Sequence, residues 1–201
     1  MVGRGVAFRR RRGPASGCLR ASNLRLVLES DEAEGNLAAD GRPVLAVDVD
    51  GVISLFGFAH PHEDSPCDWH LFDGTPHCVS RAAGQRLGRL AEHFELVWAT
   101  GWEDRANDHL PHALGIAELP TLHFGPDARF GTAHWKLGPI GEYASGRPLA
   151  WIDDNLDESC FAWAQERAEP TLLVVADSER GIEEGHVEAL IGWVEAGYTP
   201  P

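Results

Sequence analysis

The chain has 201 residues, of which 43% are hydrophobic and 8% aromatic, and its formal net charge at pH 7 is −14. This length suits one α/β domain with a substantial core and is short for two. No apolar run approaches the roughly 20 residues that a membrane-spanning helix needs, so we expect a soluble protein without a membrane partner.

The charge is unevenly distributed along the chain. Residues 1–27 hold seven Arg and no acidic residue, whereas the remainder holds 10 basic and 31 acidic residues. Because this remainder is so acidic, it repels nucleic acid, and we expect no nucleic-acid partner. An anionic substrate would need a local positive pocket or a metal ion. Residues 1–41 contain little apolar periodicity, and we predict a disordered extension there, Arg-rich and then acidic, followed by a single domain over residues 42–201.

The cysteines do not form a recognisable framework. They are scattered through the chain without CxxC spacing, at Cys18, Cys67, Cys78 and Cys160. This pattern predicts reduced thiols and a cytoplasmic location. Several His and Cys residues fall within residues 60–78, but no pair has the spacing that closes a tetrahedral zinc site, so we do not expect zinc.

From residue 42 onward, short apolar runs alternate with amphipathic stretches. The apolar runs predict strands over residues 43–47, 95–100, 119–124, 148–152 and 171–175. The amphipathic stretches predict helices over residues 81–93, 103–114, 136–145, 156–169 and 183–196. This alternation predicts an α/β fold, a Rossmann-like three-layer sandwich around a five-stranded parallel sheet. Ligands of such sheets bind at the carboxyl ends of the strands.

The first predicted strand ends in Asp48-Val49-Asp50-Gly51-Val52. Two carboxylates one residue apart repel each other unless a cation or a proton intervenes, which folding alone does not explain. Gly51 would permit a sharp turn of the backbone that leaves both carboxylates facing the crevice. A short DxDG string also occurs in calcium loops, so the motif by itself leaves its role open.

Polar residues also end two other strands. Thr100-Gly101 follows the second strand, and Asp153-Asp154-Asn155 follows the fourth. Between them stands Lys136, the only lysine among 17 basic residues. A compact ammonium suits a point where carboxylates and a phosphoryl oxygen share one charge, although a solvated lysine at a helix start is the alternative.

Taken in order, these four segments resemble the four motifs of the haloacid dehalogenase-like (HAD) superfamily, over about residues 43–176. The resemblance implies that Asp48 is the nucleophile and Asp50 the general acid/base. It also implies that Thr100 and Lys136 bind the phosphoryl group. Mg²⁺ would be bound by acids of the first and last motifs, namely Asp48, Asp50, Asp153 and Asp154, with the direct ligand left open between the last two.

Further features bear on the substrate. Gly101 and Arg105, which follow Thr100, are additional candidates for substrate binding. An acid at Asp50 favours a phosphatase or phosphotransferase, because the dehalogenating branch of the superfamily lacks this acid and the ion-pumping branch typically has Thr. Residues 53–80 look loop-like, with at most a hairpin around residues 69–72. The chain therefore resembles minimal members without a large cap domain, which often act on large substrates or use a lid from another subunit, as a homo-oligomer would provide. We expect its substrate to be a phosphorylated small molecule or a phosphorylated macromolecule.

Two kinds of non-enzymatic protein share some of these motif residues: a silent binding module and a signalling domain. A catalytically silent member of the superfamily could serve as a binding or regulatory module, but such a module has no chemical need for the whole set Asp48, Asp50, Thr100, Lys136 and Asp153. A receiver-type signalling domain also combines acids, Thr and Lys with Mg²⁺. Its phosphorylated Asp ends the third strand, however, where this chain has His123-Phe124-Gly125.

Overall fold

The computed structural model describes residues 41–58, 66–125 and 132–199. All of them belong to the compact unit Ala39–Pro201. The extension expected over residues 1–41 falls almost entirely outside the described residues, so its disorder and the domain boundary at residue 42 stay predictions.

A parallel sheet forms the centre of this unit, as the sequence predicts. Its strands are β1 (Val44–Val47), β5 (Glu95–Trp98), β6 (Leu149–Asp153) and β7 (Thr171–Val175). Their order is β5-β1-β6-β7, and every neighbouring pair is parallel. Because β1 lies between β5 and β6, the chain segments that follow these three strands meet at one edge of the sheet.

The prediction of a fifth strand over residues 119–124 is wrong. This segment forms only an isolated bridge, between Thr121 and Trp98 of β5. The Trp98 N–H donates to the Pro120 carbonyl at 2.9 Å, and the Leu122 N–H donates to the Trp98 carbonyl at 3.0 Å. Pro120 has no N–H to donate to a ladder, which limits the pairing of this edge segment to a single bridge.

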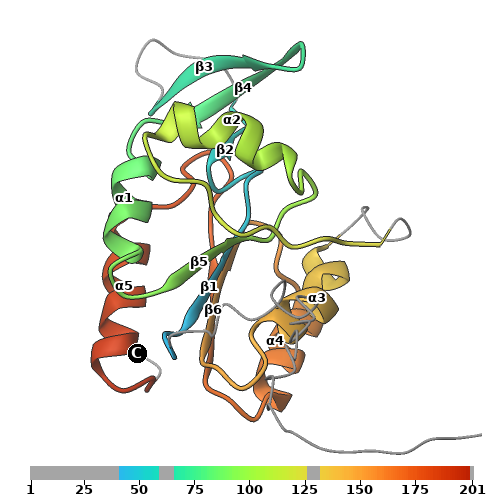
Figure 1. Ribbon diagram of the computed structural model, residues 1–201, viewed down its shortest axis with the longest axis vertical. Coiled ribbons are helices and arrows are strands. Elements are labelled where there is room, and N and C mark those ends of the chain that lie inside the picture. The colour runs from blue at the N-terminus through green and yellow to red at the C-terminus, as the bar shows by residue number, and fades with distance from the viewer. Residues whose placement is uncertain (1–40, 59–65, 126–131, 200–201) are drawn as a thin grey trace, which may run out of the picture. The chain divides into compact units, whose positions relative to one another are not determined.

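Helices cover both faces of the sheet (Figure 1). Their bounds are α1 Ala83–Leu90, α2 Arg105–Leu114, α3 Leu137–Tyr143, α4 Glu158–Glu166 and α5 Glu184–Glu195, with a short 3₁₀ helix η1 at Ala133–Lys136. On β1, Leu45 and Val47 pack with α1, α2 and α5, whereas Val44 and Ala46 pack with α3 and α4. This alternation produces the predicted three layers. No helix of the described residues is long and apolar enough to cross a membrane.

The segment after β1 forms a second, antiparallel sheet of three strands. They are β2 (Ser54–Leu55), β3 (Cys67–Phe72) and β4 (Thr75–Ser80), in the order β2-β4-β3. The β3-β4 hairpin turns at Asp73 and Gly74, whose φ angles are +49° and +81°. An Asp-Gly pair favours this two-residue turn. The segment is therefore more ordered than the loop that the sequence predicts, although no large cap domain occurs among the described residues.

The prediction of reduced thiols is wrong for one pair of cysteines. Cys67 of β3 and Cys78 of β4 form a disulfide, with their Cα atoms 5.3 Å apart. Cys67 pairs with Ser80 and Cys78 with Trp69, so the two cysteines are diagonal neighbours across the hairpin. Their separation of 11 residues carried no signal without the strand register. Cys160 is free and buried.

Two glycines of α1 allow a matched test of how closely α1 packs against α2. A Cβ atom on Gly84 would lie 2.0 Å from the Leu114 carbonyl oxygen at the end of α2, whereas one on Gly88 would meet nothing within 4 Å. We predict that Gly84→Ala lowers the free energy of unfolding by about 1–3 kcal/mol, because the backbone of α1 or of α2 must move to make room for the methyl group. Gly88→Ala should raise it by about 0.5–1 kcal/mol. Urea unfolding measures both, and equal effects of the two substitutions would contradict this packing of α1 against α2.

Candidate active site

Adjacent strands bring two acidic residues together at the edge of the parallel sheet. Asp48 directly follows β1 and Asp153 ends β6, and the register pairs Val47 with Ile152. The hydrogen bonds between β1 and β6 extend one residue beyond β1, because the Asp48 N–H donates to the Ile152 carbonyl at 3.1 Å. Asp48 is 6% exposed and Asp153 is 1% exposed. Two carboxyl groups are therefore held side by side and nearly out of contact with water.

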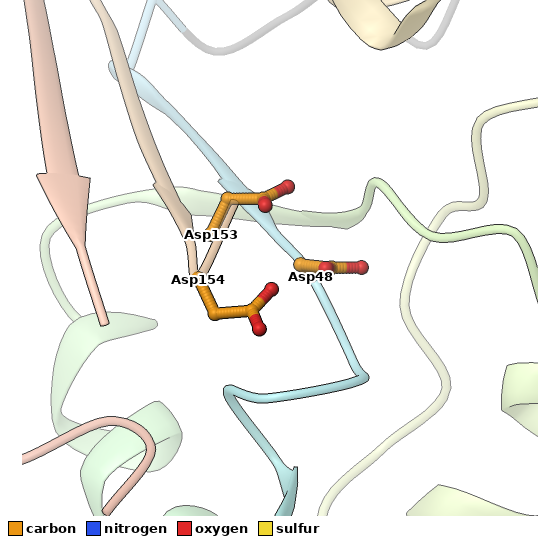
Figure 2. Close-up of side chains that lie close together, drawn as sticks. All are labelled: Asp48, Asp153 and Asp154. Carbon is orange, nitrogen blue, oxygen red and sulfur yellow. The ribbon is translucent and has the colours of Figure 1, made fainter. Parts of the chain in front are cut away.

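Asp154 adds a third carboxyl group to this pair. Ligand oxygens of Asp48, Asp153 and Asp154 lie within 4.8 Å of one another. Figure 2 shows the three carboxyl groups pointing to the same side of the strand ends. It is the only such group of potential metal ligands in the part of the chain that the structure describes. Carboxylate oxygens are the ligands that Mg²⁺ prefers in proteins, so these residues fit the predicted metal.

Lys136 supplies the positive charge of the site. Its Nζ lies 2.8 Å from Asp48 Oδ1 and 2.7 Å from Asp153 Oδ2, and its side chain is 4% exposed. The residue ends η1 and directly precedes α3, so it enters the site from the helical layer rather than from the sheet. The alternative of a solvated lysine is wrong. Three ionised carboxylates with one ammonium still leave a charge of −2, which a divalent cation would neutralise.

Burial and the neighbouring charges shift the pKa values of these groups. Burial raises the pKa of Asp48 to about 7; Lys136 counteracts this shift, and Asp153 adds to it. Burial, and next the neighbouring Asp153, raises the pKa of Asp154 to about 6. Burial alone would lower the pKa of Lys136, but Asp48 and Asp153 together raise it. Without a metal ion, the carboxyl groups of Asp48 and Asp154 therefore lose their protons at a higher pH than ordinary aspartates do.

Gly51 is the residue that lets the chain turn against these acids. Its φ angle is +74°, and a Cβ atom there would lie 2.3 Å from carboxyl atoms of Asp154. Its N–H donates to the Ser54 carbonyl at 2.8 Å, which closes the turn. Both the left-handed backbone and the close approach to Asp154 require glycine. The turn leaves Asp48 and Asp50 lining the same pocket, as the sequence predicts.

That pocket, of about 210 Å³, lies over the three acids and Lys136. Asp50 lines it from an exposed position, and its Oδ2 accepts a hydrogen bond from Trp102 Nε1 at 2.8 Å. Asp50 is not part of the close group of carboxylates, so its role as a metal ligand stays a prediction. The contact with Trp102 was missed, because nothing in the sequence links an indole to an acid 52 residues earlier.

The predicted binding residues that follow β5, Thr100 and Gly101, lie near the end of β1 but outside the pocket. The Ala99 N–H donates to the Val47 carbonyl at 2.8 Å, which places Thr100 beside the end of β1. Thr100 is fully buried, and its Oγ1 accepts from the Trp102 N–H at 3.3 Å. Gly101 is half-buried. Neither residue is among those that line the pocket over the acids. Their binding roles stay predictions.

Arg105 is engaged elsewhere. Its Nη2 lies 2.6 Å from Asp73 Oδ2 at the tip of the β3-β4 hairpin, and both side chains are more than half exposed. Its role in substrate binding also stays a prediction. Of the residues considered for zinc, Cys67 and Cys78 are joined in the disulfide, whereas His60 and His62 lie outside the described residues.

Comparison with known proteins adds no assignment, because neither the protein-family models nor the curated proteins contain a match to this chain. The functional argument therefore rests on the geometry of the site. What that geometry shows is an α/β fold with a buried group of three carboxyl groups that can hold a metal ion.

The raised pKa of Asp154 leads to a pH-dependent prediction. Its folded-state pKa of about 6 lies above the ordinary value of 3.8, so folding favours the protonated acid and stability falls as pH rises through this window. Without metal, Asp154→Asn should therefore raise the melting temperature at pH 8 and change it little at pH 4. Saturating Mg²⁺ at pH 8 should stabilise the wild type more than the variant.

Differential scanning fluorimetry in chelator and in Mg²⁺ measures these shifts. Asp108→Asn is the matched control, because it removes a carboxyl group from the exposed surface of α2. The same shift for Asp154→Asn at both pH values, or equal stabilisation of the two proteins by Mg²⁺, would contradict this account of the acids.

Proposed function

We propose that this protein is a Mg²⁺-dependent phosphatase of the haloacid dehalogenase type, without a large cap domain, which hydrolyses a phosphomonoester through an aspartyl-phosphate on Asp48. The observation that carries the proposal is the group formed by Asp48, Asp153 and Asp154 around the ammonium of Lys136. A structural role does not account for it, because burying three acids with one cation costs stability. A phosphoryl-transfer site needs both the nucleophile and the positive charge.

In the proposed reaction, Asp48 is the nucleophile. Its carboxyl group faces the pocket, and Lys136 is 2.8 Å from one of its oxygens. Attack of a carboxylate on a phosphate ester brings two anions together, so the reaction needs nearby positive charge. Mg²⁺ bound at the three acids would supply further positive charge to the phosphoryl oxygens. Lys136 holds the oxygen of Asp48 in place and favours its ionised form.

In the proposed reaction, Asp50 is the general acid and base. It lines the same pocket as Asp48, but it is exposed and outside the close group of acids, where it can exchange protons. In the first step, Asp48 bonds to phosphorus, the ester P–O bond breaks, and Asp50 gives a proton to the leaving oxygen. In the second step, Asp50 takes a proton from water that attacks the phosphorus, which releases phosphate and restores Asp48. The Trp102 indole would orient Asp50 throughout.

The same geometry serves a phosphotransferase, in which an alcohol replaces water in the second step. A silent binding module is less consistent with it, because such a module would not need an acid poised beside the nucleophile. The substrate would be a phosphorylated small molecule or macromolecule. Measuring phosphate release against transfer to added alcohol separates the two enzymatic reactions.

Two substitutions of chemically identical residues test the mechanism. Asp48→Asn removes the nucleophile, so turnover of an aryl phosphate should vanish and no phosphoryl adduct should form. Asp50→Asn retains the nucleophile but removes the proton donor and base, whose loss typically costs about 10²–10⁴-fold in rate. An aryl phosphate with a good leaving group needs little protonation and should still phosphorylate Asp48. Intact-protein mass spectrometry after acid quenching detects the adduct.

The expected pattern is an added phosphoryl group on the Asp50→Asn protein and none on the Asp48→Asn protein. Asp108→Asn, on the exposed surface of α2, should retain wild-type turnover and serves as the control for lost charge. Wild-type turnover by Asp48→Asn would refute the proposed function, and so would full activity after complete removal of metal.

A further inference from the structure

A second pocket adjoins the one over the acids. It has a volume of about 390 Å³ and is lined by Asp50, Ser54, Leu55, Phe56, Gly57, Phe58, Trp69, Pro76, His77 and Cys78. Asp50 and Phe56 line both pockets. A molecule that places its phosphoryl group over the three acids can therefore extend past Asp50 into this second space.

Aromatic and apolar side chains form the walls of the second pocket. Trp69 of β3 is 57% exposed. It pairs across the hairpin with Cys78 of β4, which is two residues along the strand from Pro76. Phe56, which is 49% exposed, and Phe58 line it from the segment that follows β2. Burying exposed aromatic surface is favourable, and large aromatic side chains left at a pocket commonly contact a ligand. Trp69 offers a flat surface on which an aromatic ring can stack.

The charge of the pocket restricts what it can hold. Its lining contains no Lys or Arg among the described residues, and Asp50 is its only acid. Burial lowers the pKa of His77, whose Nδ1 lies 3.0 Å from Ser54 Oγ, so this histidine is neutral at pH 7. A second phosphate or a carboxylate would meet the carboxylate of Asp50, and the positive charge of Arg105, which acts on His77, is already paired with Asp73. The lining therefore suits an uncharged group.

The hairpin that carries Trp69 is fixed to the rest of the unit. The Phe72 ring stacks on His109 of α2 with 4.7 Å between their centroids, and Arg105 of α2 pairs with Asp73 at the turn. The Cys67–Cys78 disulfide joins the two strands of the hairpin. The pocket is therefore formed before any ligand arrives, which reduces the entropic cost of binding.

We propose that the second pocket binds the organic part of the substrate and selects a phosphomonoester of an uncharged aromatic alcohol, with Trp69 as the stacking surface. This inference rests on the proposed phosphatase function. The ester oxygen would then lie at the junction of the two pockets, beside Asp50. That is the position from which Asp50 can protonate the leaving oxygen.

Three substrates with similar alkoxide leaving groups test the selection. Benzyl phosphate carries an uncharged ring, cyclohexylmethyl phosphate has the same size without aromaticity, and 4-carboxybenzyl phosphate adds a charge. We expect the wild type to show its highest kcat/KM with benzyl phosphate. Trp69→Ala should lower that value about tenfold, equivalent to about 1.4 kcal/mol, and change the value for cyclohexylmethyl phosphate much less. Leu71→Ala, on the same strand and 72% exposed, is the matched control and should change neither.

Separate outcomes decide the two proposals. If the wild type hydrolyses all three esters equally and Trp69→Ala has no effect, the aromatic pocket is overturned while the phosphatase stands. If neither these esters nor the aryl phosphate of the previous test is hydrolysed, the phosphatase proposal fails. Saturation-transfer NMR with 2-naphthalenemethanol then tests the pocket without turnover: binding that Trp69→Ala abolishes and Leu71→Ala retains supports an aromatic site, and absence of binding to the wild type overturns it.

Discussion

Lys136 is held between Asp48 and Asp153, at 2.8 and 2.7 Å, and the three side chains are almost completely buried. The ammonium compensates only part of the negative charge, because Asp154 adds a third carboxyl group within 4.8 Å of the other two. Burial is the main cause of the raised pKa values of Asp48 and Asp154, and the neighbouring Asp153 adds to both. The site thus favours either protons or a metal ion, and the proposed function follows from the second case.

Several features of the fold hold the three acids and Lys136 close together. Neighbouring strands β1 and β6 hold Asp48 and Asp153 in register, and Gly51 allows the chain to turn against Asp154 without a clash. Lys136 arrives from η1, which packs on one face of the sheet through Ala133. Removing any one of these features would separate the charges. Stability is given up locally to keep them together, as is common at functional sites.

Much of this arrangement could be predicted from the sequence, because it depends on local signals. Continuous apolar runs mark the four strands of the sheet, and polar residues directly after them mark the edge that carries the three acids. The single lysine of the chain indicated that Lys136 had a special role. The contacts that were missed depend on register between distant segments. Trp102 donates to Asp50 across 52 residues, and Cys67 meets Cys78 only because a hairpin aligns them. The segment around Pro120 reads as a strand by its apolar residues but forms a single bridge.

The most direct test of the central claim is the location of a metal ion. Mn²⁺ has coordination preferences close to those of Mg²⁺ and gives an anomalous signal, so crystals of the full chain grown with Mn²⁺ would reveal it. The account predicts an anomalous peak among Asp48, Asp153 and Asp154, with carboxylate oxygens at about 2.0–2.2 Å and Lys136 still beside Asp48. The account would be contradicted if Mn²⁺ bound elsewhere and no anomalous peak appeared among the three acids, with Lys136 as their only cation.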